Sequence, residues 1–389
     1  MIHHLYYNYK DLLKTPRVAI GPQRLFIATL GIFSAHAVWF FFHYLALYLS
    51  EYDIYRFWDQ SGLLPFAFGH QLTTISTLLA WFGSILTVLI ILYTNTAVSR
   101  AAYMYLRKNY YYTSKQAIHF AFRRSKSIIS VYLTFLFLIL PFIAGALLMA
   151  FIGDISGFGE IVNALATLPY IFSGMVLFFM TLCLIFSVFL SPAIIASSEE
   201  DGFGAAIQCM HLTWGQPWRL ATYGLLAVVL FFAGIISFAF VVKLGLIIYS
   251  ILFMPLMHSL APILNNALYY LEISMSGLDG LIRQLLGENG SGIIYLKQHY
   301  LPEVLTTTQS IASYIIYFSF LLMGHMALGY GQGIVNSALT MSYIIFEVKL
   351  SDRNLLERKD SEIAEDQEAF EFNIKSNTKS LKDFLKKKE

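Results

Sequence analysis

Charged residues are scarce in this chain of 389 residues: Asp, Glu, Lys and Arg make up 13% of it, whereas hydrophobic residues make up 57%. A typical soluble domain is about 25% charged. Because so much apolar surface cannot be hidden inside one core, the composition excludes a water-soluble globular protein. Alternating segments of about ten residues are also missing, so the apolar segments are expected to be helices and not the strands of a barrel.

Cysteine and net charge are also low. The chain has two cysteines, Cys183 and Cys209, and a formal net charge of +2. Two cysteines form neither a disulfide framework nor a metal knuckle, and the small net charge does not indicate a nucleic-acid partner. The N-terminal residues lack the apolar core and cleavage site of a secretory signal. Residues 1–24 are therefore expected to be a cytoplasmic segment.

Long apolar runs recur along the chain, and a transmembrane helix needs about 20 such residues. The sequence therefore predicts an all-α membrane protein with about six transmembrane helices, interfacial helices and a charged cytoplasmic C-terminal tail. The helical transmembrane domain is expected at 25–350 and the tail at 351–389. The predicted spans are 25–50, 72–93, 128–151, 170–195, 220–242 and 311–330.

The distribution of Lys and Arg predicts the orientation. With a cytoplasmic N-terminus, the cations of the chain fall in inner segments, apart from Arg56, Lys243, Arg283 and Lys297. By the positive-inside rule both termini are expected in the cytoplasm. Two apolar stretches of the largest outer segment, 255–271 and 278–286, are too broken to span and are expected to lie in the interface or on the bundle.

A weak internal repeat is visible by pattern. A span, an amphipathic stretch and a second span recur in Leu72–Phe151 and Tyr170–Val242, and an offset of 89 residues places Ala117 on Ala206. The end of the sixth span shows a comparable pattern. Gene duplication and chance similarity both remain open as explanations.

Two segments resemble a known family. They are SPAIIASSEEDGFGAAIQCMHLTWGQPWRLATYGLL (191–226) and GYGQGIVNSALTMSYIIFEVKLSDRNLLER (329–358). In both, a span runs into acidic residues or a charged stretch. This pattern is similar to the membrane domain attached to some glycerophosphoryl diester phosphodiesterases and to related free-standing bacterial membrane proteins. The resemblance implies a helical fold in the bacterial inner membrane. It does not imply the enzyme activity, because the chain has no region for the catalytic barrel.

Three histidines fall inside predicted spans. His36 and His43 share one face of the first span, and His325 lies in the sixth. Such residues either bind a haem or metal or form hydrogen bonds between helices. No carboxylate accompanies them, so the sequence favours hydrogen bonding and predicts no cofactor and no metal site. The cluster Glu199, Glu200 and Asp201 is expected to cap a helix.

The segment Thr94–Ser127 interleaves tyrosine and phenylalanine with many cations and contains no Asp or Glu. Cations near an anionic leaflet contribute about 1 kcal/mol each, and aromatic side chains anchor at the interface. An ordinary positive-inside signal is the alternative. The candidate lipid- or partner-binding residues are Arg107, Lys108, Lys115, Arg123, Arg124, Lys126, Trp214, Trp218 and Arg219.

No motif of a nucleotide site, hydrolase or zinc protease occurs. The leading hypothesis is therefore a non-enzymatic inner-membrane scaffold, accessory subunit of a membrane complex or lipid-interacting module. Membrane lipids are the expected partners, and the tail is expected to dock other subunits through an amphipathic helix. A transporter or lipid-translocating protein is the first alternative and would need polar positions facing one another inside the bundle. An intramembrane enzyme is the second and would need a carboxylate converging with the histidines.

Overall fold

The computed structural model of the chain describes residues 5–155, 157–277 and 300–358, and every regular element in these residues is a helix. Six of the described helices are long and apolar enough to cross a membrane. They are α3 (Pro22–Leu49), α5 (Thr74–Leu106), α7 (Ser125–Gly153), α9 (Thr167–Ser198), α11 (Pro217–Phe253) and α14 (Thr307–Ser351). The prediction of an all-α, multi-pass membrane protein is confirmed.

The helices extend beyond the predicted spans where the side chains become polar. α5 continues past the predicted end at residue 93 to Leu106, and α14 continues past residue 330 to Ser351. Hydropathy falls at both points because polar residues such as Ser, Thr and Asn follow. The added turns are stabilised by protein contacts, since residues 96–104 and 336–347 are buried throughout.

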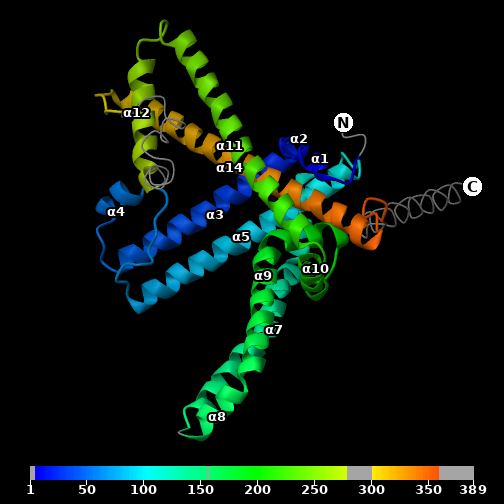
Figure 1. The fold of residues 1–389 in the computed structure, drawn as a ribbon. Helices are drawn as coiled ribbons and strands as arrows, with labels where there is room; N and C mark the ends of the chain where they lie inside the picture. Colours follow the sequence, from blue (N-terminus) through cyan, green and yellow to red (C-terminus); the bar gives the residue numbers. More distant parts are fainter. Residues whose placement is uncertain (1–4, 156, 278–299, 359–389) are drawn as a thin grey trace, which may run out of the picture.

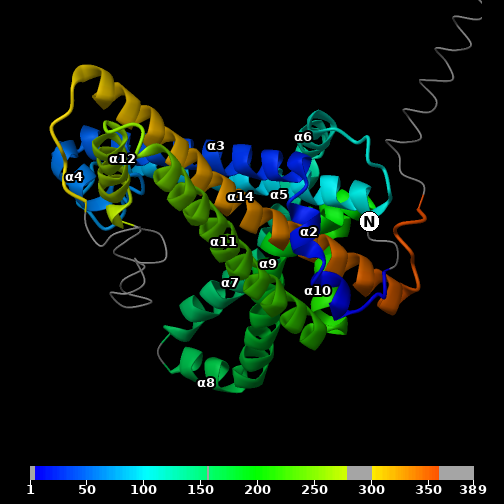
Figure 2. The same cartoon turned by 90° about the horizontal axis from the view of Figure 1, so that it is seen from above.

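The buried turns of α5, α9 and α14 pack against one another and form what we call the hub. It consists of residues 96–104 of α5, 190–198 of α9 and 336–347 of α14. An outer helix lies along each central helix: α3 along α5, α7 along α9 and α11 along α14. Figures 1 and 2 show that the three pairs extend from the hub as arms, of which the α3–α5 and α11–α14 arms contact each other through α3 and α14.

Short helices fill the grooves between the paired helices at the hub. α6 (Ser114–Arg123) packs on α5 and α3, and α10 (Gly202–Gly215) packs on α9 and α7. In the third groove, α1 (Tyr9–Leu12) and α2 (Thr15–Ala19) pack on α14 and α11. The N-terminal segment therefore contributes to the folded hub.

The three central helices also end alike. A residue at the end of each of them has a left-handed backbone conformation. Glu199 (φ 56°) and Asp352 (φ 50°) directly follow α9 and α14, and Lys108 (φ 65°) is the second residue after α5. Such a residue satisfies the last carbonyls of a helix and turns the chain sharply. α5–α6–α7 and α9–α10–α11 thus repeat the same order of elements, and Ala117 and Ala206 are both fully buried as the sequence offset pairs them.

The far ends of the arms are unequal. α4 (Ile54–Ser61) and α12 (Leu260–Ser274) join the α3–α5 arm to the α11–α14 arm, where the Leu63 amide donates to the Ser274 carbonyl at 2.7 Å. The α7–α9 arm, which ends in α8 (Phe158–Leu165), stands apart (Figure 1). α12 covers residues 260–271, so the predicted stretch 255–271 is largely helical.

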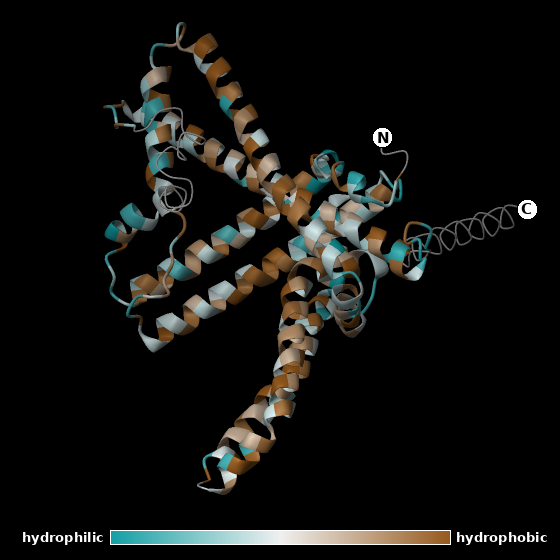
Figure 3. Ribbon diagram, viewed as in Figure 1, coloured by the Kyte–Doolittle hydropathy of each residue, from teal (hydrophilic) through white to brown (hydrophobic). Residues whose placement is uncertain are grey.

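Apolar residues cover the arms on several sides, whereas polar residues gather at the hub and the far loops (Figure 3). Phe137 and Phe172 on the α7–α9 arm are 75% and 70% exposed. Bilayer hydrocarbon is as apolar as these side chains, so such arms are compatible with lipid around them and not with water.

Two expectations can be compared with the structure only in part. The stretch 278–286 and residues 359–389 of the tail lie outside the described residues. The described start of the tail departs from a solvated arm, because Leu355 is buried in the hub and its carbonyl accepts from the Tyr103 hydroxyl at 2.7 Å. The sequence pattern missed this because an isolated Leu-Leu in a charged segment gives little hydropathy signal.

Candidate functional site

Glu199 organises the charges of the hub. It ends α9, and its carboxylate accepts from Arg100 of α5 at 3.3 Å and from Arg124 at the α6–α7 junction, also at 3.3 Å. Arg100 is fully buried; it donates to the Ala196 carbonyl at 2.9 Å and stacks over Phe120 at 4.2 Å. One acidic residue therefore joins two central helices to the junction before α7.

The acidic cluster has divided roles. Asp201 caps α10, since its side chain accepts from the Gly204 amide at 2.7 Å. The expected capping role is therefore confirmed for Asp201. Glu199 instead forms the two ion pairs with arginine.

The cations of the α5–α7 segment fall into two groups. Arg124 is half-buried against Glu199, and the Arg107 guanidinium donates to the Arg358 carbonyl at 2.7 Å. Lys115, Arg123 and Lys126 form the second group and are exposed on α6 and the start of α7, although Arg123 also has a contact within the chain. This second group is the part of the predicted site that can meet a ligand from outside the chain.

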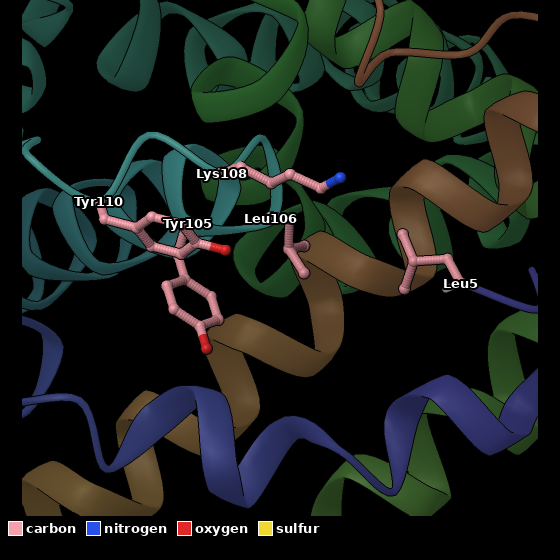
Figure 4. Close-up of a pocket in the computed structure, with 5 residues that line it drawn as sticks. All are labelled: Leu5, Tyr105, Leu106, Lys108 and Tyr110. Carbon is pink, nitrogen blue, oxygen red and sulfur yellow. The ribbon is translucent and has the colours of Figure 1, made fainter. Parts of the chain in front are cut away.

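Lys108 lies at a small pocket beside the N-terminal segment. Leu5, Tyr105, Leu106 and Tyr110 complete its lining (Figure 4). The rings of Tyr105 and Tyr110 meet edge to face at 5.6 Å. The left-handed conformation of Lys108 directs the chain away from α5 at this point.

Trp214, Trp218 and Arg219 form a second surface at the α10–α11 junction. The two tryptophans are 78% and 83% exposed, and the Trp214 ring meets Phe179 of α9 edge to face at 5.5 Å. Arg219 donates to the Gln216 side chain at 3.3 Å. α6 and α10 occupy different grooves on different sides of the hub (Figure 2), so the predicted residues form two patches and not one site.

The intramembrane histidines are hydrogen-bonded, as the sequence favoured. His36 of α3 and His325 of α14 contact each other through Nδ1 and Nε2 at 2.8 Å. His43 accepts through Nδ1 from the Ala67 amide and contacts the Ser84 hydroxyl through Nε2, both at 3.2 Å. Within the described part of the chain, no group of three or more His, Cys, Asp or Glu residues is placed to hold a metal ion.

An amide cluster between α5 and α14 was not found from the sequence. Gln332 and Asn336 both donate to the Asn95 side-chain oxygen, at 2.7 and 2.9 Å. The spacing of Gln332 and Asn336, four residues apart on one helix face, is the signal that could have indicated it. Hydropathy alone does not indicate it, because these residues lie just beyond the predicted ends of the spans at 93 and 330.

The cysteines are buried and unpaired with each other. Burial raises the pKa of the Cys209 thiol, which lies on α10 within the hub. A buried thiol of raised pKa carries no thiolate at neutral pH and is unreactive.

Comparison with known proteins found no match: no family model, no curated protein and no solved structure is similar to this chain. The resemblance to the membrane domain of glycerophosphoryl diester phosphodiesterases stays a prediction from the two sequence segments. A functional proposal for this chain therefore rests on its own geometry.

Proposed function

We propose that the chain is a non-enzymatic protein of the bacterial inner membrane that binds anionic lipid headgroups at its hub and serves as a scaffold or accessory subunit of a membrane complex. In this proposal the hub and both termini lie on the cytoplasmic side. Lipids are the first partners, and the C-terminal tail is the segment for docking other subunits.

The outward cations of α6 and α7 carry this proposal. Lys115, Arg123 and Lys126 are exposed at the hub end of apolar helices, in the same segment of the chain as the exposed side chains of Tyr111 and Phe122. Exposed cations beside exposed aromatic rings suit the headgroup region of an anionic leaflet. Arg124 contributes less in this proposal, because its charge is already paired with Glu199.

The test replaces Lys115, Arg123 and Lys126 together with Gln. We expect the purified variant to retain less phosphatidylglycerol or cardiolipin than the wild type in native mass spectrometry, and raised salt to lower retention by the wild type as well, since exposed charges are screened over about 8 Å at physiological ionic strength. Arg56→Gln, on α4 at the far end, is the control. Equal lipid retention by the triple variant and the wild type would contradict the proposal.

A lipid-translocating protein or transporter is the second candidate, favoured by the amide cluster of Asn95, Gln332 and Asn336. These polar side chains face one another between two membrane helices, and the buried Gln332 Oε1 has no hydrogen-bond partner among the described residues. Vesicles with fluorescent phospholipids would test it. Transbilayer movement that depends on the wild-type protein and falls in Gln332→Leu would support translocation, and movement no faster than in empty vesicles would exclude it.

A further inference from the structure

The contact between His36 and His325 lies in the middle parts of α3 and α14, away from the hub. His325 is buried and His36 is half-buried. Each ring makes a second contact: His36 Nε2 lies 2.8 Å from the Leu63 carbonyl oxygen, and His325 Nδ1 lies 2.7 Å from the Leu321 carbonyl oxygen. The two rings thus form a chain of three hydrogen bonds from one carbonyl to the other.

This chain needs more protons than two neutral rings carry. Carbonyl oxygens only accept, so His36 Nε2 and His325 Nδ1 must both be N–H donors. The contact between the rings then needs a third proton, on His36 Nδ1 or on His325 Nε2. A neutral imidazole carries one N–H, and therefore two neutral rings can supply two of the three hydrogen bonds.

His43 provides an internal comparison on the same helix. Its Nδ1 accepts from the Ala67 amide, and its Nε2–H can donate to the Ser84 hydroxyl, which in turn donates to the Ala80 carbonyl. One neutral ring satisfies both contacts. His43 therefore needs no additional proton, whereas the pair of His36 and His325 needs one.

We propose that His36 and His325 form a proton-binding site that holds one additional proton between the two rings and joins α3 to α14 while that proton is bound. Loss of the proton leaves two lone pairs facing each other at the ring contact, so one of the three hydrogen bonds must break. Intramembrane ionisable groups are costly and usually serve a function. Here the segment after α4 supplies the Leu63 carbonyl, so its hydrogen bond to His36 would depend on whether the additional proton is bound.

In the described residues, the elements packed against the pair carry further charged or titratable groups. They are Arg24, His43, Tyr44 and Tyr48 on α3, Tyr55, Arg56 and Asp59 on α4, Tyr93, Arg100, Tyr103 and Tyr105 on α5, Arg219, Tyr223, Lys243 and Tyr249 on α11, Tyr269, Tyr270 and Glu272 on α12, and Tyr314, Tyr317, Tyr330, Tyr343, Glu347 and Lys349 on α14. Residues 62–68 carry no ionisable side chain, and α5 has no Asp, Glu, Lys, Arg or His between Thr74 and Ser99. In the described ranges, no carboxylate forms an ion pair with either ring. The additional charge is therefore held by hydrogen bonds to carbonyls and between rings.

The experiment uses the full chain in lipid nanodiscs, with 15N-labelled histidine and Gln at every histidine except His36, His43 and His325. We expect nitrogen NMR to show one doubly protonated ring and a scalar coupling between two ring nitrogens through the N–H···N bond. Both signals should disappear as the pH is raised from about 5 to about 8, the range in which histidine titrates.

Two variants separate the pair from its neighbour. His43→Gln should keep the coupling and the doubly protonated ring, whereas His325→Gln should lose both and leave His36 neutral. If His325→Gln does not fold, the titration of the parent protein and of His43→Gln is sufficient. Neutral rings at every pH in this range, or a doubly protonated signal that disappears in His43→Gln, would overturn the proposal.

Discussion

Glu199 shows how one residue can set the stability of the hub. Arg100 is fully buried, and its charge is balanced by Glu199, whose side chain is itself 9% exposed. Removing one partner of a buried ion pair leaves an uncompensated charge, which typically costs about 3–5 kcal/mol. The pair therefore matters less for its net attraction than for the cost of breaking it.

We accordingly predict that Glu199→Gln lowers the free energy of unfolding by about 3 kcal/mol, measured by denaturant unfolding in detergent micelles. The neighbouring carboxylate supplies the control, because Glu200 is exposed and forms no ion pair with the arginines of the hub in the described part of the chain. Glu200→Gln should leave the unfolding midpoint nearly unchanged. The same loss in both variants would mean that the Arg100 contact is not what stabilises the hub.

At the scale of the helix, close backbone approach joins α14 to α3. A Cβ atom added at Gly329 would lie 2.7 Å from the Thr29 hydroxyl and 2.8 Å from the Thr29 backbone nitrogen. Small residues at membrane helix contacts allow backbones to approach in this way. Because backbone atoms of α3 cannot rotate away, even one methyl group should force the two helices apart.

Gly329→Ala is therefore predicted to lower the melting temperature of the purified protein. Gly324→Ala is a matched control on the same helix, since a Cβ there meets no atom within 4 Å. It should keep or raise the melting temperature, because alanine favours a helix over glycine by about 1 kcal/mol. Equal effects of the two substitutions would contradict the close contact between α14 and α3.

The elements differ in how far the sequence could predict them. Six apolar runs were enough to place the long helices, because hydropathy reports lipid contact directly. It could not report that α5 and α14 continue into the hub, where Arg100 and Asn336 are buried by neighbouring helices. The shared face of His36 and His43 was predictable from helical spacing, but their partners Leu63 and Ala67 lie in an irregular segment that has no sequence period.

The candidate surfaces were predictable as residue types and not as an arrangement. A run of cations marks the α6 segment, yet sequence alone could not separate Arg124, paired with Glu199, from the exposed Lys126. That distinction depends on a contact between residues 75 positions apart. It decides which cations remain available to a headgroup.

For the whole molecule, the hub has three grooves and three sets of short helices, and the N-terminal α1 and α2 fill the third. The two described ends of the chain meet there: the Tyr7 hydroxyl donates to the Asn354 side chain at 3.5 Å. The first helices in the chain, α1 and α2, thus fill the groove formed by α11 and the last long helix, α14. Stability of the hub should then depend on a segment that precedes every membrane helix.

Leu12 and Leu13 test this dependence. Leu12 of α1 is fully buried in the hub, whereas its neighbour Leu13 is 54% exposed. Leu12→Ala should lower the free energy of unfolding by about 2–5 kcal/mol, the range for a buried leucine, and Leu13→Ala should change it little. Denaturant unfolding in micelles measures both. An unaffected Leu12→Ala protein would show that the N-terminal helices add nothing to the hub.

The orientation of the whole molecule follows from where its cations lie. Most described Lys and Arg residues are at the hub, whereas Arg56 and Lys243 lie toward the far ends of the arms. The positive-inside rule then predicts a cytoplasmic hub. Single cysteines at Ser114, on α6, and at Asp154, at the tip of the α7–α9 arm, report the two sides in a chain whose Cys183 and Cys209 are replaced by Ser.

In intact cells, an impermeant maleimide should label the cysteine at position 154 and not the one at position 114, while lysed cells should label both. Ser198 is expected on the hub side as well, but it is buried and so unsuited to labelling, and Asn289, expected outside, lies beyond the described residues. The six long helices run alternately away from the hub and back to it, so the hub lies on one side of the membrane. A site found on the opposite side from the one expected would therefore mean that the whole hub lies on that side. Labelling of position 114 in intact cells would therefore place the hub cations outside and remove the basis for their contact with the anionic inner leaflet.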